Sequence, residues 1–277
     1  MIDILLSTYN GEKYLMQQIQ SFFDQTYTNW RLIIRDDGST DQTLVILNKL
    51  AENYKDKIIL HRGKNIGTIK SYEWLLTQSD AEYTMFSDHD DIWMDTKIEV
   101  TFLKMNELES KFTEIPLLVF TNLRVVNENL ELVNESFWKY SKLDVKLCSD
   151  FNYLGVCNCV NACTIMINSK ARSLCLPFSD KTKMHDSWIA LKVCKNGVID
   201  YVDKPTILYR QHSENVFGAA KEKINTISSY LMSRVKSLNM VINGNRLQFE
   251  LLRELNYGNI FKYLYYKISY LVKARLI

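Results

Sequence analysis

Short apolar segments alternate with segments of helical periodicity over the first ninety residues, and this alternation restricts the possible folds more than any other feature. The apolar segments cover residues 2–8, 30–35, 57–61 and 83–86, and small or acidic residues follow each of them. Between them, apolar residues recur at the spacing of one helix face. Strands that alternate with helices predict an α/β layer with a mainly parallel sheet. Ligands bind such sheets at the carboxyl ends of the strands, so this part of the chain is typical of a nucleotide-binding half.

The chain beyond residue 90 continues the α/β pattern and then changes in character. Further strands are expected at 117–122, 163–168, 197–201 and 206–210, and a helix at 186–193. With 277 residues, of which 47% are apolar, the chain can bury a large core, and this composition excludes extensive disorder. We expect a catalytic domain over 1–218 and a helical tail over 219–277.

The tail is strongly basic. After residue 220, ten basic residues stand against three acidic ones, a net charge of +7, whereas the whole chain carries only +2. The small overall charge gives no field that would attract nucleic acid. Two apolar stripes at helical spacing run through the tail: Ile227, Tyr230, Leu231, Val235 and Leu238, and then Ile260, Phe261, Leu264, Tyr265, Ile268, Leu271 and Val272. Such helices suit an anionic membrane surface, and packing against the catalytic domain or a second subunit is the alternative.

The N-terminus and the cysteines bear on the compartment. Residues 1–6 lack the basic and apolar regions of a signal peptide, and no segment reads as a membrane-spanning helix. We therefore expect a cytoplasmic protein, either free or peripheral on the inner face of the membrane. Free thiols are expected in this reducing compartment, and a zinc cluster of Cys157, Cys159 and Cys163 is the less favoured alternative. The cysteines concerned are Cys148, Cys157, Cys159, Cys163, Cys175 and Cys194.

An acidic cluster follows the fourth apolar segment. Asp88, Asp90 and Asp91 lie within four residues, and three carboxylates so close repel one another unless a cation offsets their charge. Residues two apart on a strand point to the same face, so Asp88 and Asp90 can converge. Hard oxygen ligands suit Mg²⁺ or Mn²⁺. The alternative is a solvated acidic turn in which Asp91 caps a helix.

Other acidic residues are also placed at strand or helix ends. Asp36 and Asp37 follow the second strand, where an acid can accept hydrogen bonds from a ribose or a base; a turn with a helix cap is the alternative. Asp186 opens a helix, either as a cap favoured by the helix dipole or as a general base. His212 follows the last strand among polar residues, as a structural hydrogen-bonding group or as a ligand. No glycine-rich dinucleotide or P-loop motif is present, which disfavours those two classes.

Five motifs in a fixed order resemble the family 2 glycosyltransferases of GT-A fold. They are Ser7-Thr8-Tyr9-Asn10-Gly11-Glu12, Arg35-Asp36-Asp37-Gly38-Ser39-Thr40-Asp41, Asn65-Ile66-Gly67, Phe86-Ser87-Asp88-His89-Asp90-Asp91-Ile92-Trp93, and His185-Asp186 followed by Leu208-Tyr209-Arg210-Gln211-His212. The resemblance covers about residues 2–218 and is greatest to the bacterial branch that includes rhamnosyltransferase-like enzymes of cell-surface polysaccharide synthesis.

The resemblance implies a fold and a set of roles. The fold would be a GT-A mixed sheet flanked by helices, with a C-terminal helical appendage. Asp186 would be the catalytic base, and Asp90, His212 and Asp88 would hold Mn²⁺ or Mg²⁺. The donor-binding residues would be Thr8, Asn10, Glu12, Asp37, Asn65, Gly67 and Asp88.

The implied reaction is inverting, metal-dependent transfer of a sugar from a UDP- or dTDP-sugar donor to a hydroxyl of a glycan acceptor. The acceptor would be lipid-linked or protein-linked, in bacterial surface polysaccharide or glycoprotein synthesis. Two alternatives remain at this point, a sugar nucleotidyltransferase and a non-catalytic nucleotide-sugar-binding protein.

Overall fold

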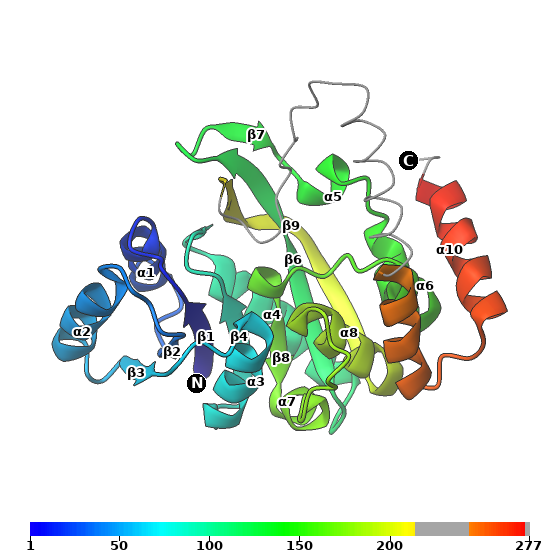
Figure 1. Ribbon diagram of the computed structural model, residues 1–277, viewed down its shortest axis with the longest axis horizontal. Helices are drawn as coiled ribbons and strands as arrows, with labels where there is room; N and C mark the ends of the chain where they lie inside the picture. The colour runs from blue at the N-terminus through cyan, green and yellow to red at the C-terminus, as the bar shows by residue number, and fades with distance from the viewer. Residues whose placement is uncertain (214–243, 275–277) are drawn as a thin grey trace.

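The computed structural model describes residues 1–213 and 244–274 (Figure 1). The strands are β1 (Ile2–Thr8), β2 (Trp30–Asp36), β3 (Ile58–Arg62), β4 (Tyr83–Ser87), β5 (Ile92–Trp93), β6 (Leu117–Asn127), β7 (Leu132–Asn134), β8 (Met166–Asn168) and β9 (Val198–Gln211). The α-helices are α1 (Leu15–Phe23), α2 (Thr43–Asn53), α3 (Thr68–Gln78), α4 (Lys97–Lys111), α5 (Phe137–Tyr140), α6 (Phe151–Val156), α7 (Ser169–Cys175), α8 (His185–Asn196) and α10 (Ile260–Ala274). A further helix covers 244–254, and short 3₁₀ turns lie at Val145–Ser149 and Ala162–Thr164.

A single mixed sheet joins the strands of the described residues. Its order is β3-β2-β1-β4-β8-β6-β9-β5, and β7 pairs with β6. The four strands expected at the N-terminus are parallel neighbours, so their carboxyl ends meet at one edge of the sheet. Strand β8 then runs antiparallel to both β4 and β6, which makes the sheet mixed rather than mainly parallel. The expected fold, a mixed sheet with flanking helices and a C-terminal helix, is confirmed.

Two of the expected strand assignments are wrong in detail. The segment 163–168 begins as a 3₁₀ turn, and only Met166–Asn168 is a strand. The two strands expected at 197–201 and 206–210 are one long strand, β9. Its register against β6 shifts where Asn122 pairs with Pro205. A proline donates no ladder hydrogen bond, so it interrupts the pairing locally without ending the strand.

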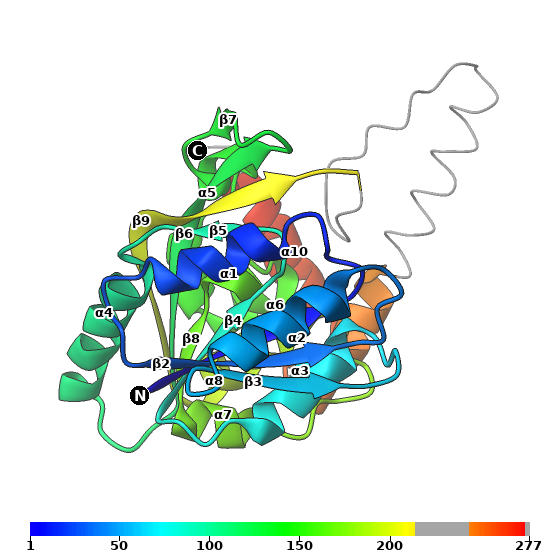
Figure 2. The same cartoon turned by 90° about the vertical axis from the view of Figure 1, so that its left-hand side faces the viewer.

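Helices cover both faces of the sheet (Figure 2). Alternate residues of β1 point to opposite faces, so Ile4 and Leu6 join one hydrophobic core and Leu5 joins the other. Helices α1 and α4 contribute Phe22 and Met105 to the first core, and α3 and α8 contribute to the second. Burial on both faces fixes the register of β1 and β4, and this register places the residues that follow them.

The described part of the tail packs into the second core. Buried tail residues in this core are Leu251, Leu252, Leu255, Tyr257, Tyr263 and Tyr270. The Lys195 ammonium group donates to the backbone oxygen of Leu255 at 2.6 Å, and Tyr153 and Ser269 share a hydrogen bond of 3.0 Å between α6 and α10. The first tail stripe, residues 227–238, lies outside the described residues. Over the described ranges, no helix combines the length and apolar character that crossing a membrane requires.

The expectation that all the cysteines are free is wrong for one pair. Cys148 and Cys159 form a disulfide with their Cα atoms 6.4 Å apart, and Cys157, Cys163, Cys175 and Cys194 are free. Both bonded residues are buried, one before and one after α6. Folding of the intervening segment brings them together, and their spacing in the sequence does not reveal this. The pairing also removes Cys159 from the alternative zinc cluster.

Candidate active site

The acidic cluster lies directly after the central strand β4. Asp88 and Asp90 are half-buried and Asp91 is fully buried. The preceding Ser87 is held from two sides, because Gln18 of α1 donates to its hydroxyl at 2.6 Å and Tyr72 of α3 donates to its backbone oxygen at 2.6 Å. The sheet and two helices therefore fix the start of this turn.

Asp90 contacts His212 beside the paired strands β5 and β9. The Asp90 Oδ2 and His212 Nε2 atoms are 2.9 Å apart, although the two residues are 122 positions apart in the chain. His212 follows the end of β9, and its ring lies 4.8 Å from the ring of Tyr14, measured between centroids. The structure thus brings together two of the residues to which the family resemblance gives a metal-binding role.

The cluster carries negative charge that its surroundings offset only in part. Burial, then the charges of Asp90 and Asp186, raise the pKa of Asp88 to about 7. Burial, then the charges of Asp90 and Asp88, raise the pKa of Asp91 well above its usual value. Burial would also raise the pKa of Asp90, but the hydrogen bond to His212 and the charge of His89 hold it below its usual value. A divalent cation would relieve this repulsion.

Two sets of side chains could contribute to a cation site. Ligand atoms of Asp88, Asp91 and Cys163 lie within 4.8 Å of one another. Burial raises the pKa of the Cys163 thiol well above its usual value, so this group stays protonated and is a poor ligand for a hard cation. Asp90 and His212 offer a carboxylate oxygen and an imidazole nitrogen, although little of either side chain is exposed. The chemistry of the donors therefore fits Mg²⁺ or Mn²⁺ at Asp90 and His212, with Asp88 next to them.

Arg210 connects this turn to its surroundings, a role that the sequence analysis missed. Its side chain donates to the backbone oxygen of Asp90 at 2.9 Å, to the backbone oxygen of Glu128 at 2.9 Å and to Gln17 Oε1 at 2.7 Å. The guanidinium also lies 4.4 Å from the centre of the Tyr14 ring. The sequence feature that could have indicated this role is an arginine two residues before His212, at the end of a strand. A guanidinium buried there needs several hydrogen-bond acceptors.

Replacing Arg210 with alanine is expected to raise the metal concentration needed for half-maximal activity by roughly 10–100-fold, the usual cost of removing a group that orients metal ligands. Lysine cannot reproduce three directed contacts, so the Arg210→Lys variant should recover only part of the native metal requirement. Initial rates against Mn²⁺ concentration measure the effect, with the exposed Arg246→Ala as the matched control. An unchanged metal requirement in a variant with native thermal stability would contradict this role.

Asp186 lies in the first turn of α8. The helix cap itself is Met184, and the Asp186 carboxylate accepts a hydrogen bond from the backbone nitrogen of Ser187. Burial raises the pKa of Asp186 to about 7, against the opposing effect of backbone hydrogen bonds from Ser187 and Ala162. The charge of Asp186 also raises the pKa of Asp88, so the start of α8 lies close to the acidic turn. A carboxylate that titrates near neutral pH is suited to accept a proton.

An aromatic stack joins the Asp186 helix to the acidic turn. The rings of His185 and Tyr72 are stacked with centroids 4.0 Å apart, and the Tyr72 hydroxyl lies 3.4 Å from Asp88 Oδ1. Burial lowers the pKa of His185 to about 3, so its imidazole is neutral. The stack fixes α8 relative to β4. The spacing of His185 and Tyr72 in the sequence does not indicate that their rings are in contact.

Asp37 organises the donor side of the sheet edge. Its carboxylate accepts hydrogen bonds from the backbone nitrogens of Ile66 and Gly67, each at 2.9 Å, and from Arg35. Asp37 is buried, and its backbone nitrogen donates to the backbone oxygen of Thr8 at 2.8 Å. In this structure the carboxylate therefore orders the loop that contains Asn65 and Gly67, and its expected contact with the donor stays a prediction.

Asn10 and Glu12 are exposed and bind the turn before α2. Asn10 Oδ1 accepts from the backbone nitrogen of Thr40 at 2.9 Å, and Glu12 Oε2 accepts from the backbone nitrogen of Gln42 at 2.7 Å. The first two motifs thus form one continuous surface beside Asp37. The hydroxyl of Thr8 is buried and has no hydrogen-bond partner within the described ranges, and its expected contact with the donor stays a prediction.

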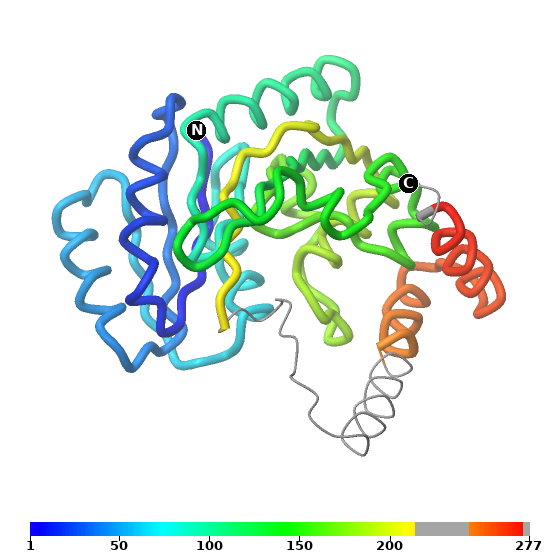
Figure 3. Tube along the Cα trace, turned by 90° about the horizontal axis from the view of Figure 1, so that it is seen from above, coloured from blue at the N-terminus to red at the C-terminus, as the bar shows by residue number. Residues whose placement is uncertain are grey.

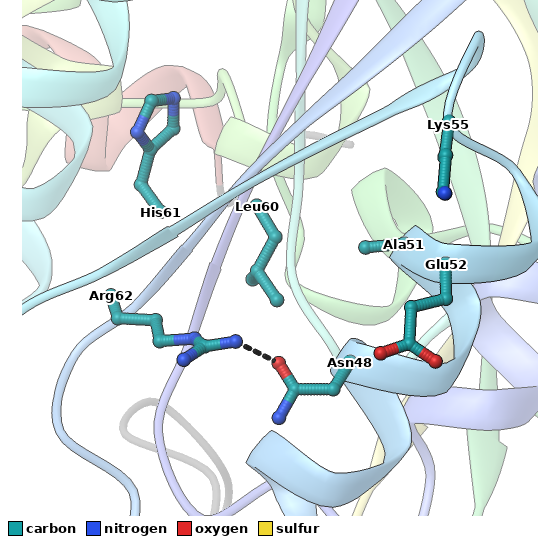
Figure 4. A pocket seen from close by; sticks show the side chains of 7 residues that line it. All are labelled: Asn48, Ala51, Glu52, Lys55, Leu60, His61 and Arg62. Carbon is teal, nitrogen blue, oxygen red and sulfur yellow. Dashed lines mark hydrogen bonds between the residues drawn. The ribbon is translucent and has the colours of Figure 1, made fainter.

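A separate pocket lies between α2 and β3 (Figure 4). It has a volume of about 490 Å³ and is lined by Asn48, Ala51, Glu52, Lys55, Leu60, His61 and Arg62. Arg62 donates a hydrogen bond to Asn48 across it. None of these residues belongs to the five motifs, and the pocket holds no group of carboxylates. The active site is therefore assigned to the strand ends and not to this pocket.

Comparison with known proteins decides the family. The family model described as Glycosyl transferase family 2 matches residues 3–148, which is more than half of the chain and includes the first four motifs. The chain belongs to this glycosyltransferase family. Its sequence is 29% identical over 234 residues to the dTDP-rhamnosyl transferase RfbG of Shigella flexneri, a match that covers 77% of this chain and 74% of that protein. It is 25% identical over 258 residues to an uncharacterized glycosyltransferase of Rickettsia typhi, covering 90% of this chain and 77% of the relative.

Solved structures agree on the fold. The glycosyltransferase chain is similar to S. aureus TarS 1-349 with a TM-score of 0.57 and 19% identity, over 76% of this chain and 60% of that one. The same TarS fragment in complex with UDP-GlcNAc gives a TM-score of 0.56 and 18% identity, over 91% and 71% of the two chains. The resemblance to family 2 glycosyltransferases is thus confirmed, and the chain is a nucleotide-sugar transferase.

Proposed function

We propose that this glycosyltransferase transfers a sugar, with inversion, from a UDP- or dTDP-sugar to a hydroxyl of a glycan acceptor in bacterial surface polysaccharide or glycoprotein synthesis. The observation that carries the proposal is the convergence of Asp90 and His212 at 2.9 Å beside a second carboxylate, Asp88, whose pKa responds to Asp186. The dTDP-sugar option rests on the similarity to RfbG, and the UDP-sugar option on the similarity to the TarS complex.

The residues divide the chemistry between them. Asp90 and His212, with Asp88, would hold Mn²⁺ or Mg²⁺, and the cation supplies positive charge for the departing nucleoside diphosphate. The motifs around Thr8, Asn10, Glu12 and Asp37, with Asn65 and Gly67 on the adjoining loop, form the donor side. Asp186 accepts the proton of the acceptor hydroxyl as that oxygen attacks the anomeric carbon. Attack opposite the leaving group inverts the anomeric configuration.

Several finer assignments remain proposals. The division into a catalytic domain over 1–218 and a tail over 219–277 is one of them, since the described tail shares a core with α8. The lipid-linked or protein-linked nature of the acceptor is another, as are a cytoplasmic location, peripheral membrane contact and oligomer formation through the tail. The nucleotidyltransferase alternative is less favoured, because residues 6–14 offer no glycine-rich phosphate loop with a basic residue.

A screen of nucleotide sugars tests the proposed reaction. The full chain is incubated with UDP-glucose, UDP-galactose, UDP-GlcNAc and dTDP-rhamnose, with Mn²⁺ or with EDTA, and release of the nucleoside diphosphate is measured. We expect one donor to be hydrolysed slowly without an acceptor, only in the presence of the metal. Release of pyrophosphate from a sugar phosphate and a nucleoside triphosphate would instead support a nucleotidyltransferase. Binding without turnover in the presence of glycan acceptors would support a non-catalytic protein.

A further inference from the structure

Helix α10 presents a continuous apolar face to solvent. It lies at the outer edge of the molecule, where it packs beside α6 (Figure 3). Its inner face is anchored by the buried rings of Tyr263 and Tyr270. Its outer face carries side chains that are between 40% and 77% exposed: Ile260, Phe261, Leu264, Tyr265, Ile268, Leu271 and Val272. At 3.6 residues per turn, these positions fill one uninterrupted arc of about 140°.

This arc differs from ordinary surface exposure of apolar residues. Single exposed residues such as Leu103 on α4 or Tyr54 after α2 are common on folded proteins. On α10, every position of the arc is a large aliphatic or aromatic residue, and the helix extends for roughly 22 Å. A contiguous apolar strip of this size is typical of an interaction site.

The charged residues of α10 itself are all positive, and Asp144 and Asp150 of the adjoining segment lie near Lys273. Helix α10 contains three lysines and no acidic residue. Lys262 and Lys273 are eleven positions apart and therefore lie along one edge of the arc, and Lys267 lies along the other. Lys267 donates inward to the backbone oxygen of Val156 at 2.9 Å, whereas Lys262 and Lys273 are exposed and rest over the Tyr257 and Tyr153 rings.

We propose that the outer face of α10 is a docking surface for a lipid bilayer that contains anionic headgroups. The apolar arc would enter the boundary between headgroups and acyl chains, and the lysines along its edge would meet the anionic headgroups. Phe261 and Tyr265 supply the aromatic side chains that favour this interface. A second copy of the chain fits less well, because α10 has no acidic side chain that could pair with the lysines of a partner α10.

Vesicle binding by the full chain tests the docking surface. Sedimentation is measured with vesicles of pure phosphatidylcholine and with vesicles that contain phosphatidylglycerol. We expect binding to the anionic vesicles, weakened by added salt because the lysine contribution is screened. The double variant Phe261→Asp/Ile268→Asp should bind at least about tenfold more weakly, because two apolar contacts are lost and two negative charges are added. Leu103→Asp, at a site of similar exposure on α4, is the matched control and should bind like the unmodified chain.

Further measurements distinguish the loss of a lipid-binding face from a disturbed fold or a lost dimer. Circular dichroism of the double variant, and calorimetry with both UDP and dTDP, show whether the fold and the donor site persist, since no α10 residue belongs to the proposed site. Light scattering without lipid reports the oligomeric state. A dimer that dissociates in the double variant would overturn the proposal in favour of a second copy. Equal binding by both variants, or no binding of the full chain to anionic vesicles, would overturn it as well. These outcomes do not depend on which donor the enzyme uses.

Discussion

Asp90→Ala is expected to abolish metal-dependent transfer, lowering the rate at least about 10²–10³-fold, while the protein stays folded. The loss follows because Asp90 is the carboxylate that faces His212, and the departing diphosphate needs positive charge at this point. The fold should persist, because removing Asp90 also removes a charge that raises the pKa values of Asp88 and Asp91. Initial rates with Mn²⁺ and thermal unfolding with and without Mn²⁺ measure both effects.

A neighbouring acidic residue provides the control for this substitution. Asp95 is exposed and lies five residues further along the chain, so Asp95→Ala removes the same charge without touching the cluster. In the unmodified chain and in this control, Mn²⁺ should raise the unfolding temperature, because a ligand that binds only the folded state stabilises it. In Asp90→Ala this increase should be lost. Full activity in EDTA, or in Asp90→Ala, would remove the metal assignment.

The N-terminal half of the fold could be predicted from local patterns, and the C-terminal half only in part. Strands β1 to β4 are short, mainly apolar runs separated by helical segments, so periodicity alone identifies them, although β3 is only partly buried. The expected break between 201 and 206 was wrong, because a polar stretch around Pro205 interrupts the pattern while the backbone continues as β9. The order of β8 and β6 depends on antiparallel pairing between distant segments, and a local pattern does not contain this information.

The candidate site shows the same division. Asp90 and His212 were predicted as metal ligands from the family resemblance, and the structure places them 2.9 Å apart. The groups that hold this pair were not predicted, because their roles come from contacts between elements far apart in the chain. Arg210 joins α1, the acidic turn and the turn after β6, and no motif spacing indicates that its guanidinium has three separate acceptors.

Asp186→Asn should bind donor and metal as the unmodified enzyme does and lose transfer by about 10²–10⁴-fold, the usual effect of removing a general base. Asparagine keeps the size of the side chain and can still accept a hydrogen bond from Ser187, so α8 should begin as before. Calorimetry with UDP and with dTDP, next to single-turnover transfer, separates binding from catalysis. Ser187→Ala, one residue further along the same turn, is the control for disturbance of the helix start.

The pH dependence distinguishes a base from a helix cap. Burial raises the pKa of Asp186 to about 7, and only the ionised carboxylate can accept the acceptor proton. Transfer should therefore increase as the pH rises through about 7 and fall roughly tenfold per pH unit below it. Asp88 has a pKa of about 7 for a similar reason, but a bound cation favours its ionised form, so saturating metal should remove its contribution. The remaining acidic limb then belongs to Asp186 and should be absent in Asp186→Asn. If the variant keeps both its rate and this limb, Asp186 only stabilises the start of α8, and another group accepts the proton.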